Sequence, residues 1–179
     1  VSLVGDAAAF DQIRVGSNGS DLNISKHGKV IGNVYVETSD SSDRRSVVVH
    51  VKAPDVRVFN MSGSGQIVVG KMKSTAVTFN QTGSGKIAVS QVVASHANFN
   101  NAGSGTILVD DVKADYVVLT MAGSGTINCQ TSKADNLNCT LTGSGRISVS
   151  GKAGNYKNYV LGSGKISDSM LKYDKLLNM

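Results

Sequence analysis

The sequence contains no tryptophan, a single proline (Pro54) and only two cysteines among its 179 residues. Two cysteines are too few for a scaffold held together by disulfide bonds. The scarcity of proline excludes a collagen triple helix, although 20 glycines are present, because collagen needs glycine at every third position and abundant proline. No run approaches roughly 18 apolar residues, which excludes a transmembrane helix. Hydrophobic residues still make up 40% of the chain, enough to form a folded core.

The positive charge is concentrated toward the C-terminus. Residues 133–179 carry seven Lys and Arg against three Asp and Glu, whereas residues 1–132 carry 11 against 10. An excess of this kind can attract anionic partners such as nucleic acid, lipid headgroups or acidic polysaccharide. Because no cluster of five basic residues occurs, we interpret the charge as a contribution to solubility and expect no nucleic-acid partner.

Most of the glycine belongs to one tripeptide, Gly-Ser-Gly, which occurs six times. The distance between successive copies is 20 residues four times and then 19. A fixed period of this length is typical of proteins built from stacked structural repeats. Glycine is needed where φ is positive or where a second backbone passes close by. We therefore assign structural turns to Gly63, Gly65, Gly83, Gly85, Gly103, Gly105, Gly123, Gly125, Gly143, Gly145, Gly162 and Gly164.

Equivalent positions around the tripeptide carry similar residues. Isoleucine stands four residues after the first glycine in all six copies, and valine or Cys129 follows two residues later until Asp168 replaces it. Apolar and polar residues alternate, which predicts β-strands. Each repeat is thus expected to contain a strand, the Gly-Ser-Gly turn, a second strand and a looser turn. The looser turns are expected at residues 73–75, 93–95, 113–115, 133–135 and 152–155.

The repeat predicts an all-β fold, a parallel β-helix or β-solenoid of 20-residue coils. The leucine-rich repeat class is the competing architecture, but its signature is missing. We expect one domain over residues 1–179. It would comprise an irregular N-terminal β cap at 1–58, regular repeats at 59–166 and a C-terminal cap at 167–179, where the tail looks amphipathic.

A column of polar residues precedes the tripeptide and is predicted to point outward. It comprises Asn60, Asn80, Asn100, Thr120 and Thr140, beside a second column of Thr78, Asn98, Val118 and Asn138. Stacked coils would repeat these side chains about every 4.8 Å. Such a strip can bind a periodic ligand, either a glycan or ice. The alternative is an ordinary solvated sheet face with amide ladders.

Two aspartates, Asp115 and Asp135, occupy equivalent positions in adjacent repeats. Together with Asp110 and Asp111 they could act as acid and base in polysaccharide cleavage, or bind calcium. The neighbouring lysines favour a simpler interpretation, in which these aspartates are neutralised residues of a surface turn.

The other reactive side chains point to no active site. His27, His50 and His96 are too far apart in sequence for zinc-site spacing, and no histidine is placed to activate the serines of the tripeptides. Cys129 and Cys139 fall in two inward columns, so we expect unpaired thiols in the core. We expect no metal and no cofactor.

The tripeptide turns from Gly63 to Gly164, the Ile and Val ladders and the opening stretch Ala8–Val15 resemble the auto-transporter adhesin family with a head GIN domain. The resemblance implies a parallel β-helix similar to pectin lyases, with no recognised catalytic residues and a role in cell adhesion. It also implies an extracytoplasmic location, in the periplasm, on the outer surface or secreted.

We therefore predict a non-enzymatic bacterial cell-surface or envelope module for adhesion or structural display. Its expected partner is a glycan or a surface protein, it does not span a membrane, and a homo-oligomer is left open. The alternative is a polysaccharide-active β-helix enzyme that uses the acidic turn residues.

Overall fold

The computed structural model describes residues 56–177 throughout and, before them, the backbone of five strands at residues 2–5, 14–17, 22–25, 34–40 and 43–50. These residues are all in strands, bends or short connections, and among them no helix is long and apolar enough to cross a membrane. The strands are β1 (Ser2–Gly5), β2 (Arg14–Ser17), β3 (Leu22–Ser25), β4 (Val34–Asp40), β5 (Asp43–His50), β6 (Val58–Gly63), β7 (Gln66–Gly83), β8 (Lys86–Gly103), β9 (Thr106–Gly123), β10 (Thr126–Gly143), β11 (Arg146–Leu161) and β12 (Lys165–Leu176).

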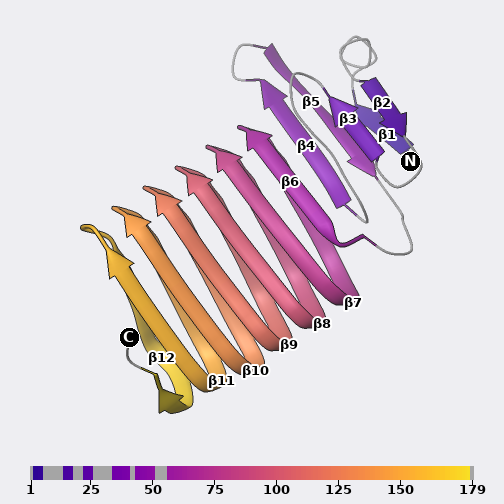
Figure 1. Ribbon diagram of the computed structural model, residues 1–179. Helices are drawn as coiled ribbons and strands as arrows, with labels where there is room; N and C mark the ends of the chain where they lie inside the picture. Colours follow the sequence, from indigo (N-terminus) through magenta and orange to yellow (C-terminus); the bar gives the residue numbers. More distant parts are fainter. Residues whose placement is uncertain are drawn as a thin grey trace.

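Strands β6 to β12 stack coil on coil, and each pairs in parallel with the next (Figure 1). The register follows the sequence period, since Ile67 is opposite Ile87 and Ile87 is opposite Ile107. The predicted all-β parallel solenoid is therefore confirmed. The one 19-residue interval is absorbed between β10 and β11, where the register shifts between Thr131 and Ala134.

The strands before residue 58 pair differently from the coils. β4 lies antiparallel to the first half of β7, so it occupies the position that a further coil would fill on that side. β5 pairs with β4, and β1 pairs with β5, both antiparallel. β6 pairs with the second half of β7, while β2 and β3 form a separate two-stranded sheet. Of the opening stretch expected at residues 8–15, only 14 and 15 lie within the described residues.

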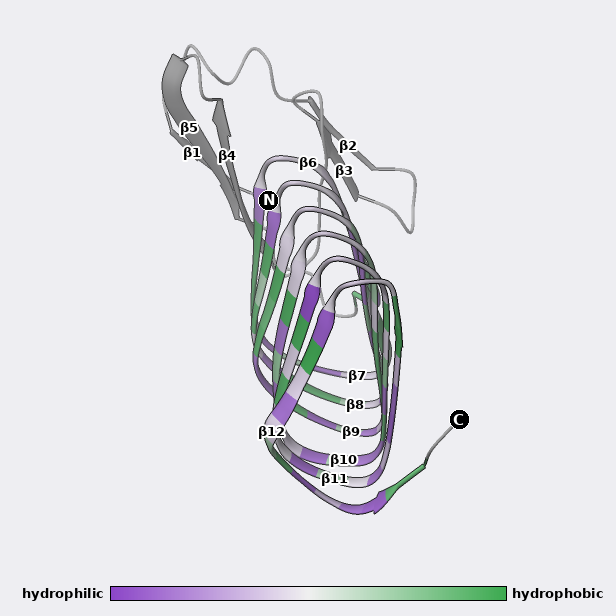
Figure 2. Cartoon of the chain, turned by 90° about the vertical axis from the view of Figure 1, so that its left-hand side faces the viewer, coloured by the Kyte–Doolittle hydropathy of each residue, from purple (hydrophilic) through white to green (hydrophobic). Residues whose placement is uncertain are grey.

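Each coil is one long strand rather than two. β7, β8, β9 and β10 each run for 18 residues from one tripeptide to the next. The looser turns bend the chain (Figure 2), but pairing continues through them, with Lys73 opposite Val93 and Ser74 opposite Ala94. The expectation of two separate strands per repeat is thus wrong, because equivalent residues of neighbouring coils bend together and keep their pairing. We call this region, residues 73–75, 93–95, 113–115, 133–135 and 152–155, the variable corner.

The six tripeptides form the glycine corner. Gly123 has φ +133°, and its carbonyl oxygen accepts hydrogen bonds from the N–H groups of Ser144 (3.1 Å) and Gly145 (2.9 Å). The same pair of bonds links most of the successive coils. A Cβ atom on Gly123 would lie 2.6 Å from the carbonyl oxygen of Gly103. The last glycine of the five later tripeptides lacks a positive φ, and it is required because a Cβ would collide with the preceding coil, as at Gly145, 2.7 Å from the carbonyl oxygen of Gly125.

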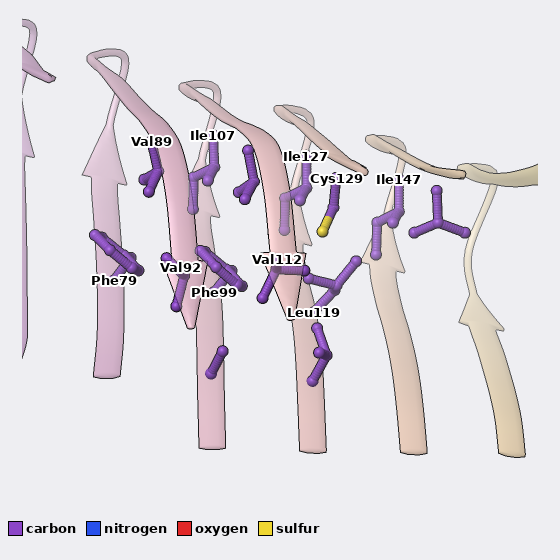
Figure 3. Packing of buried hydrophobic residues seen from close by; sticks show 14 of the residues in the cluster. Phe79, Val89, Val92, Phe99, Ile107, Val112, Leu119, Ile127, Cys129 and Ile147 are labelled. Atoms are coloured by element: carbon purple, nitrogen blue, oxygen red, sulfur yellow. The ribbon is translucent and has the colours of Figure 1, made fainter. Parts of the chain in front are cut away.

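The core lies between the two sides of the flattened coils (Figure 3). The predicted Ile, Val and Phe/Leu/Cys columns are buried in the regular coils, and Phe79 stacks on Phe59 and Phe99 with ring centroids 4.6 and 5.1 Å apart. Arg57, which departs from its apolar column, is exposed. Burial of each large apolar side chain stabilises the fold by roughly 1.5–3 kcal/mol.

A further inward column was not recognised in the sequence because its polarity is mixed. It contains Met61, Gln81, Asn101, Met121 and Leu141, all buried. Asn101 Nδ2 donates to the carbonyl oxygen of Gly105 at 2.7 Å, but its Oδ1 has no partner. Gln81 has none for either polar atom of its side chain. Strand alternation would place all five residues inside, but the two amide side chains, Gln81 and Asn101, are not typical of a core.

The C-terminal stretch continues the solenoid. β12 pairs with β11 as far as Tyr156 opposite Leu176, and the N–H of Leu177 donates to the carbonyl of Tyr156 at 2.8 Å. The segment expected to be a cap is therefore a partial coil through residue 177. Polar residues enter core columns here, and Asn158 Nδ2 donates to Asp168 at 3.3 Å. Residues 178 and 179 lie outside the described residues.

Candidate functional site

The polar column predicted to point outward does so. Asn60, Asn80, Asn100, Thr120 and Thr140 stand opposite one another in consecutive coils β6 to β10. Asn60 is exposed and the other four are half-buried, while their neighbours along each strand are buried in the core. The strand alternation that fills the core therefore also places this column at the surface.

The asparagines form a hydrogen-bonded ladder. Asn80 Nδ2 donates to Asn60 Oδ1 at 2.8 Å, and Asn100 Nδ2 donates to Asn80 Oδ1 at 2.9 Å. In the next column Asn98 Nδ2 donates to Thr78 Oγ1 at 3.5 Å. A primary amide has two N–H donors and an oxygen with two lone pairs. Each ladder bond uses one of each, so the rest remain for a ligand or water.

The surface around this column carries no formal charge. We define the neutral face as the outward residues of the segments 58–62, 76–82, 96–102, 116–122 and 136–142. None of these outward residues is Asp, Glu, Lys or Arg. On the other side of the coils, outward positions include Lys86, Asp110 and Arg146. The charges of β7 to β10 thus lie outside the neutral face, at the variable corner and on the other side of the coils, whereas Lys157 of β11 stands opposite Asn138 at the end of the face.

An aromatic pair lies on the neutral face and was not singled out in the sequence. His96 and Tyr116 stand opposite each other in β8 and β9, with ring centroids 5.0 Å apart and planes inclined by 8°. His96 is exposed, and Tyr116 is 47% exposed. Their separation of 20 residues, the coil period, is the signal that could have revealed the pair. His27 lies outside the described residues, as does the side chain of His50.

Two of the predicted acidic residues, Asp111 and Asp135, lie at or beside the variable corner and are engaged with neighbouring groups. Lys133 Nζ is 2.9 Å from Asp135 Oδ1, and this hydrogen bond and the aspartate charge raise the pKa of Lys133. Asp111 accepts from Gln91 Nε2 and from the N–H of Ser132, both at 3.0 Å, so it connects three coils.

Asp115 lines a shallow hollow along the variable corner, together with Lys73, Lys113 and Lys133. Small residues such as Ala94 and Ala114 also line it. Among residues 56–177 and the described N-terminal strands, no three His, Cys, Asp or Glu side chains approach closely enough to hold a metal ion. The hollow brings together three lysines and one carboxylate, a mixed-charge surface.

The two cysteines are free and buried, which confirms the expectation of unpaired core thiols. Burial, followed by the charge of Asp111, raises the pKa of Cys129 to about 12. Burial likewise raises the pKa of Cys139. A thiolate is the reactive form of cysteine, so both groups are chemically quiet in the folded protein.

A family model described as "Putative auto-transporter adhesin, head GIN domain" matches residues 1–110 and 97–177. This match confirms the resemblance noted in the repeats. Neither the curated proteins nor the solved structures gave a significant match, so the likeness to pectin lyases stays a prediction.

Proposed function

The chain belongs to this family of adhesin-like proteins, and we propose that it is a non-enzymatic, extracytoplasmic module that displays its repeating faces for adhesion or assembly. The observation that carries the proposal is the neutral face, where polar side chains recur at the coil spacing and hold one another in place. Such ordered side chains lose little conformational entropy when a ligand binds. A rigid, repetitive surface suits attachment to a repetitive target.

Adhesion can be tested with the full chain coupled to fluorescent beads and applied to cells or to a glycan array. The informative variant adds two charges to the neutral face, Thr120→Lys with Asn138→Lys. Its matched control adds the same two charges on the other side of the same coils, Thr106→Lys with Thr126→Lys. We expect the first variant to reduce bead retention about tenfold and the control to retain it. Lack of retention by the unmodified protein, or equal loss in both variants, would overturn the proposal.

The hollow at the variable corner keeps a second candidate function open, cleavage of an acidic polysaccharide with Asp115 as the reactive carboxyl group. The engagement of Asp135 by Lys133 and of Asp111 by two hydrogen bonds weighs against a second free carboxylate. Release of reducing ends from polygalacturonate, abolished by Asp115→Asn, would establish this function. Absence of release would eliminate it for that substrate.

A further inference from the structure

The last two coils, β11 and β12, differ in charge from the coils before them. With the turn between them they carry six Lys and Arg against two Asp, a net charge of +4, whereas β7 to β10 carry five Lys against four Asp, a net charge of +1. Arg146 stands opposite Lys165, and Lys152 stands opposite Lys172. Like charges in such positions destabilise a sheet. An anionic partner at this end of the stack would relieve the repulsion.

The two aspartates of these coils leave the basic side chains available. Asp168 accepts a hydrogen bond from Asn158 Nδ2 at 3.3 Å. Asp174 is exposed and lies between Lys172 and Lys175 along β12. Within the described part of the chain, no Lys or Arg of these two coils forms an ion pair. All six positive charges can therefore act on a partner.

The same two coils carry most of the exposed large apolar side chains. Eight are exposed among the described residues, and six of them belong to β11 and β12: Tyr159, Val160, Leu161, Met170, Tyr173 and Leu176. Met170 is 75% exposed and Leu161 56%. Tyr159 and Leu161 stand opposite the outward residues Thr140 and Thr142, so they point away from the core. Figure 2 shows hydrophobic and hydrophilic residues side by side along β12, an arrangement typical of a surface that binds a partner.

We propose that this end of the stack docks on a membrane surface rich in anionic lipids. In this arrangement Lys172 and Lys175 contact the lipid phosphates, and Met170 enters between the headgroups. Lysine and tyrosine suit this boundary because each has an apolar part and a polar tip. β12 is the last strand of its sheet, and its free edge keeps unpaired backbone groups. Such groups are costly in hydrocarbon, so the contact stays at the level of the headgroups.

The inference goes beyond the proposed adhesive function, because it concerns how the module is attached and not what it attaches to. The neutral face lies on β6 to β10 and remains free when the last two coils rest on a membrane. Bead adhesion through the neutral face can therefore persist when vesicle binding fails, and each function has its own test.

Charge and apolar exposure together favour a membrane over two other partners. A second copy docked end to end would bring together two surfaces of net charge +4, which repel each other. An acidic polymer would satisfy the lysines but would leave Met170 and Leu161 in water, whereas the lipid boundary removes apolar surface from water.

Flotation of the full chain with lipid vesicles tests the inference. Vesicles of phosphatidylcholine alone are compared with vesicles that also contain phosphatidylglycerol, at low and at high salt. We expect binding to the anionic vesicles only, and weaker binding at high salt because salt screens the attraction. Equal binding to both kinds of vesicle, or binding to neither, would overturn the inference.

A matched pair of charge variants locates the contact. Lys172→Gln with Lys175→Gln is expected to weaken vesicle binding about tenfold or more. The control, Lys71→Gln with Lys73→Gln, removes the same charge from β7 and is expected to retain most of the binding. Equal losses in the two variants would mean that only the net charge of the protein matters, and this would contradict the proposal.

The apolar part of the contact has its own variant. Met170→Ser is expected to weaken vesicle binding about threefold, while unfolding midpoints show whether the variant still folds. Unchanged vesicle binding would show that Met170 enters no lipid and that attraction to any polyanion is enough, which counts against a membrane. A dimer in sedimentation experiments that Met170→Ser abolishes would assign the surface to a second copy and would also overturn the proposal.

The absence of tryptophan from the chain allows a direct measurement of position. Met170→Trp introduces one indole at the proposed contact, and Tyr116→Trp introduces one at an exposed position on the neutral face. We expect anionic vesicles to shift the emission of the Met170→Trp protein to shorter wavelength and to leave that of the Tyr116→Trp protein unchanged. A shift in the second protein alone would place the membrane contact elsewhere and refute the assignment.

Discussion

The glycine corner and the variable corner turn the same chain, yet they tolerate different residues. The glycine corner repeats Gly-Ser-Gly in six coils, whereas the variable corner changes from Lys73-Ser74-Thr75 to Lys133-Ala134-Asp135. At the glycine corner, backbone atoms of one coil lie where a Cβ atom of the next would be. At the variable corner, most positions carry side chains of differing size, and the register itself shifts. Glycine is therefore required where the backbones of adjacent coils touch. Where side chains lie between the coils, only the size and polarity of the residue matter.

The largest effect is expected from a side chain at the glycine corner in the middle of the stack. Gly123→Val introduces both an unfavourable φ of +133° and a contact with the Gly103 carbonyl. We expect a loss of about 3 kcal/mol or more in the free energy of unfolding, measured in urea.

Gly63→Val is the matched control, since Gly63 also has a positive φ, +98°, but its Cβ would have no described atom within 4 Å. It is expected to cost only the conformational term, about 1–2 kcal/mol. Equal losses at Gly63 and Gly123 would show that φ alone, and not the approach of the coils, makes glycine necessary.

A gain in stability is expected beneath the glycine corner. Gln81 is 1% exposed and neither polar atom of its side chain has a partner. Gln81→Met places there the residue that the same column already has at Met61 and Met121. We expect the free energy of unfolding to rise by about 1–2 kcal/mol. Asn101→Met should gain less, because Asn101 donates a 2.7 Å bond to Gly105; a larger gain there would contradict this interpretation.

Alkaline pH is expected to lower the free energy of unfolding through the buried thiol of Cys129, which lies next to the variable corner. The pKa of Cys129 rises from its ordinary value of 9.0 to about 12 on folding. Above pH 9 the unfolded chain loses this proton while the folded chain keeps it. The contribution of Cys129 to the free energy of unfolding is therefore fully present below pH 9 and is lost as the pH rises toward 12. The loss at pH 10 from this group is on the order of 1 kcal/mol.

Cys129→Val, which restores the residue of its column, should remove that part of the decline in unfolding experiments between pH 7 and 10. Parallel declines in the two proteins would contradict the assignment of the alkaline effect to Cys129.

The smallest effect is expected at the surface of the variable corner. Lys133 and Asp135 form an ion pair 2.9 Å long, but their side chains are 60% and 48% exposed. Solvent and salt screen such pairs strongly. Asp135→Asn should therefore leave the unfolding midpoint unchanged within error. A clear loss would mean that this corner contributes more to stability than its residue variation indicates.

The sequence predicted the fold well because, in a solenoid, residues one repeat period apart in sequence lie opposite each other in adjacent coils. Ile67 and Ile87 are 20 residues apart and lie opposite each other, so the ladder could be foreseen without knowing any other contact. Gln81 could not be recognised as a core residue, because its polarity argues against burial and only the pleat of the strand places it inside. Gly151, with φ +105°, was likewise missed, because it belongs to no tripeptide and compensates for the single 19-residue interval.

For the candidate site, the sequence identified the outward polar column but not the aromatic pair beside it. The amino-acid pattern by itself determined the coil length, the buried columns and the need for glycine at one corner, because these follow from strand alternation and a constant period. Only the tertiary structure decided that β4 pairs with the first half of β7, that the outward positions of one face carry no charge from β6 to β10, and that His96 stacks on Tyr116 there. Those features depend on how strands and side chains far apart in sequence share a surface, and no local preference along the chain encodes them.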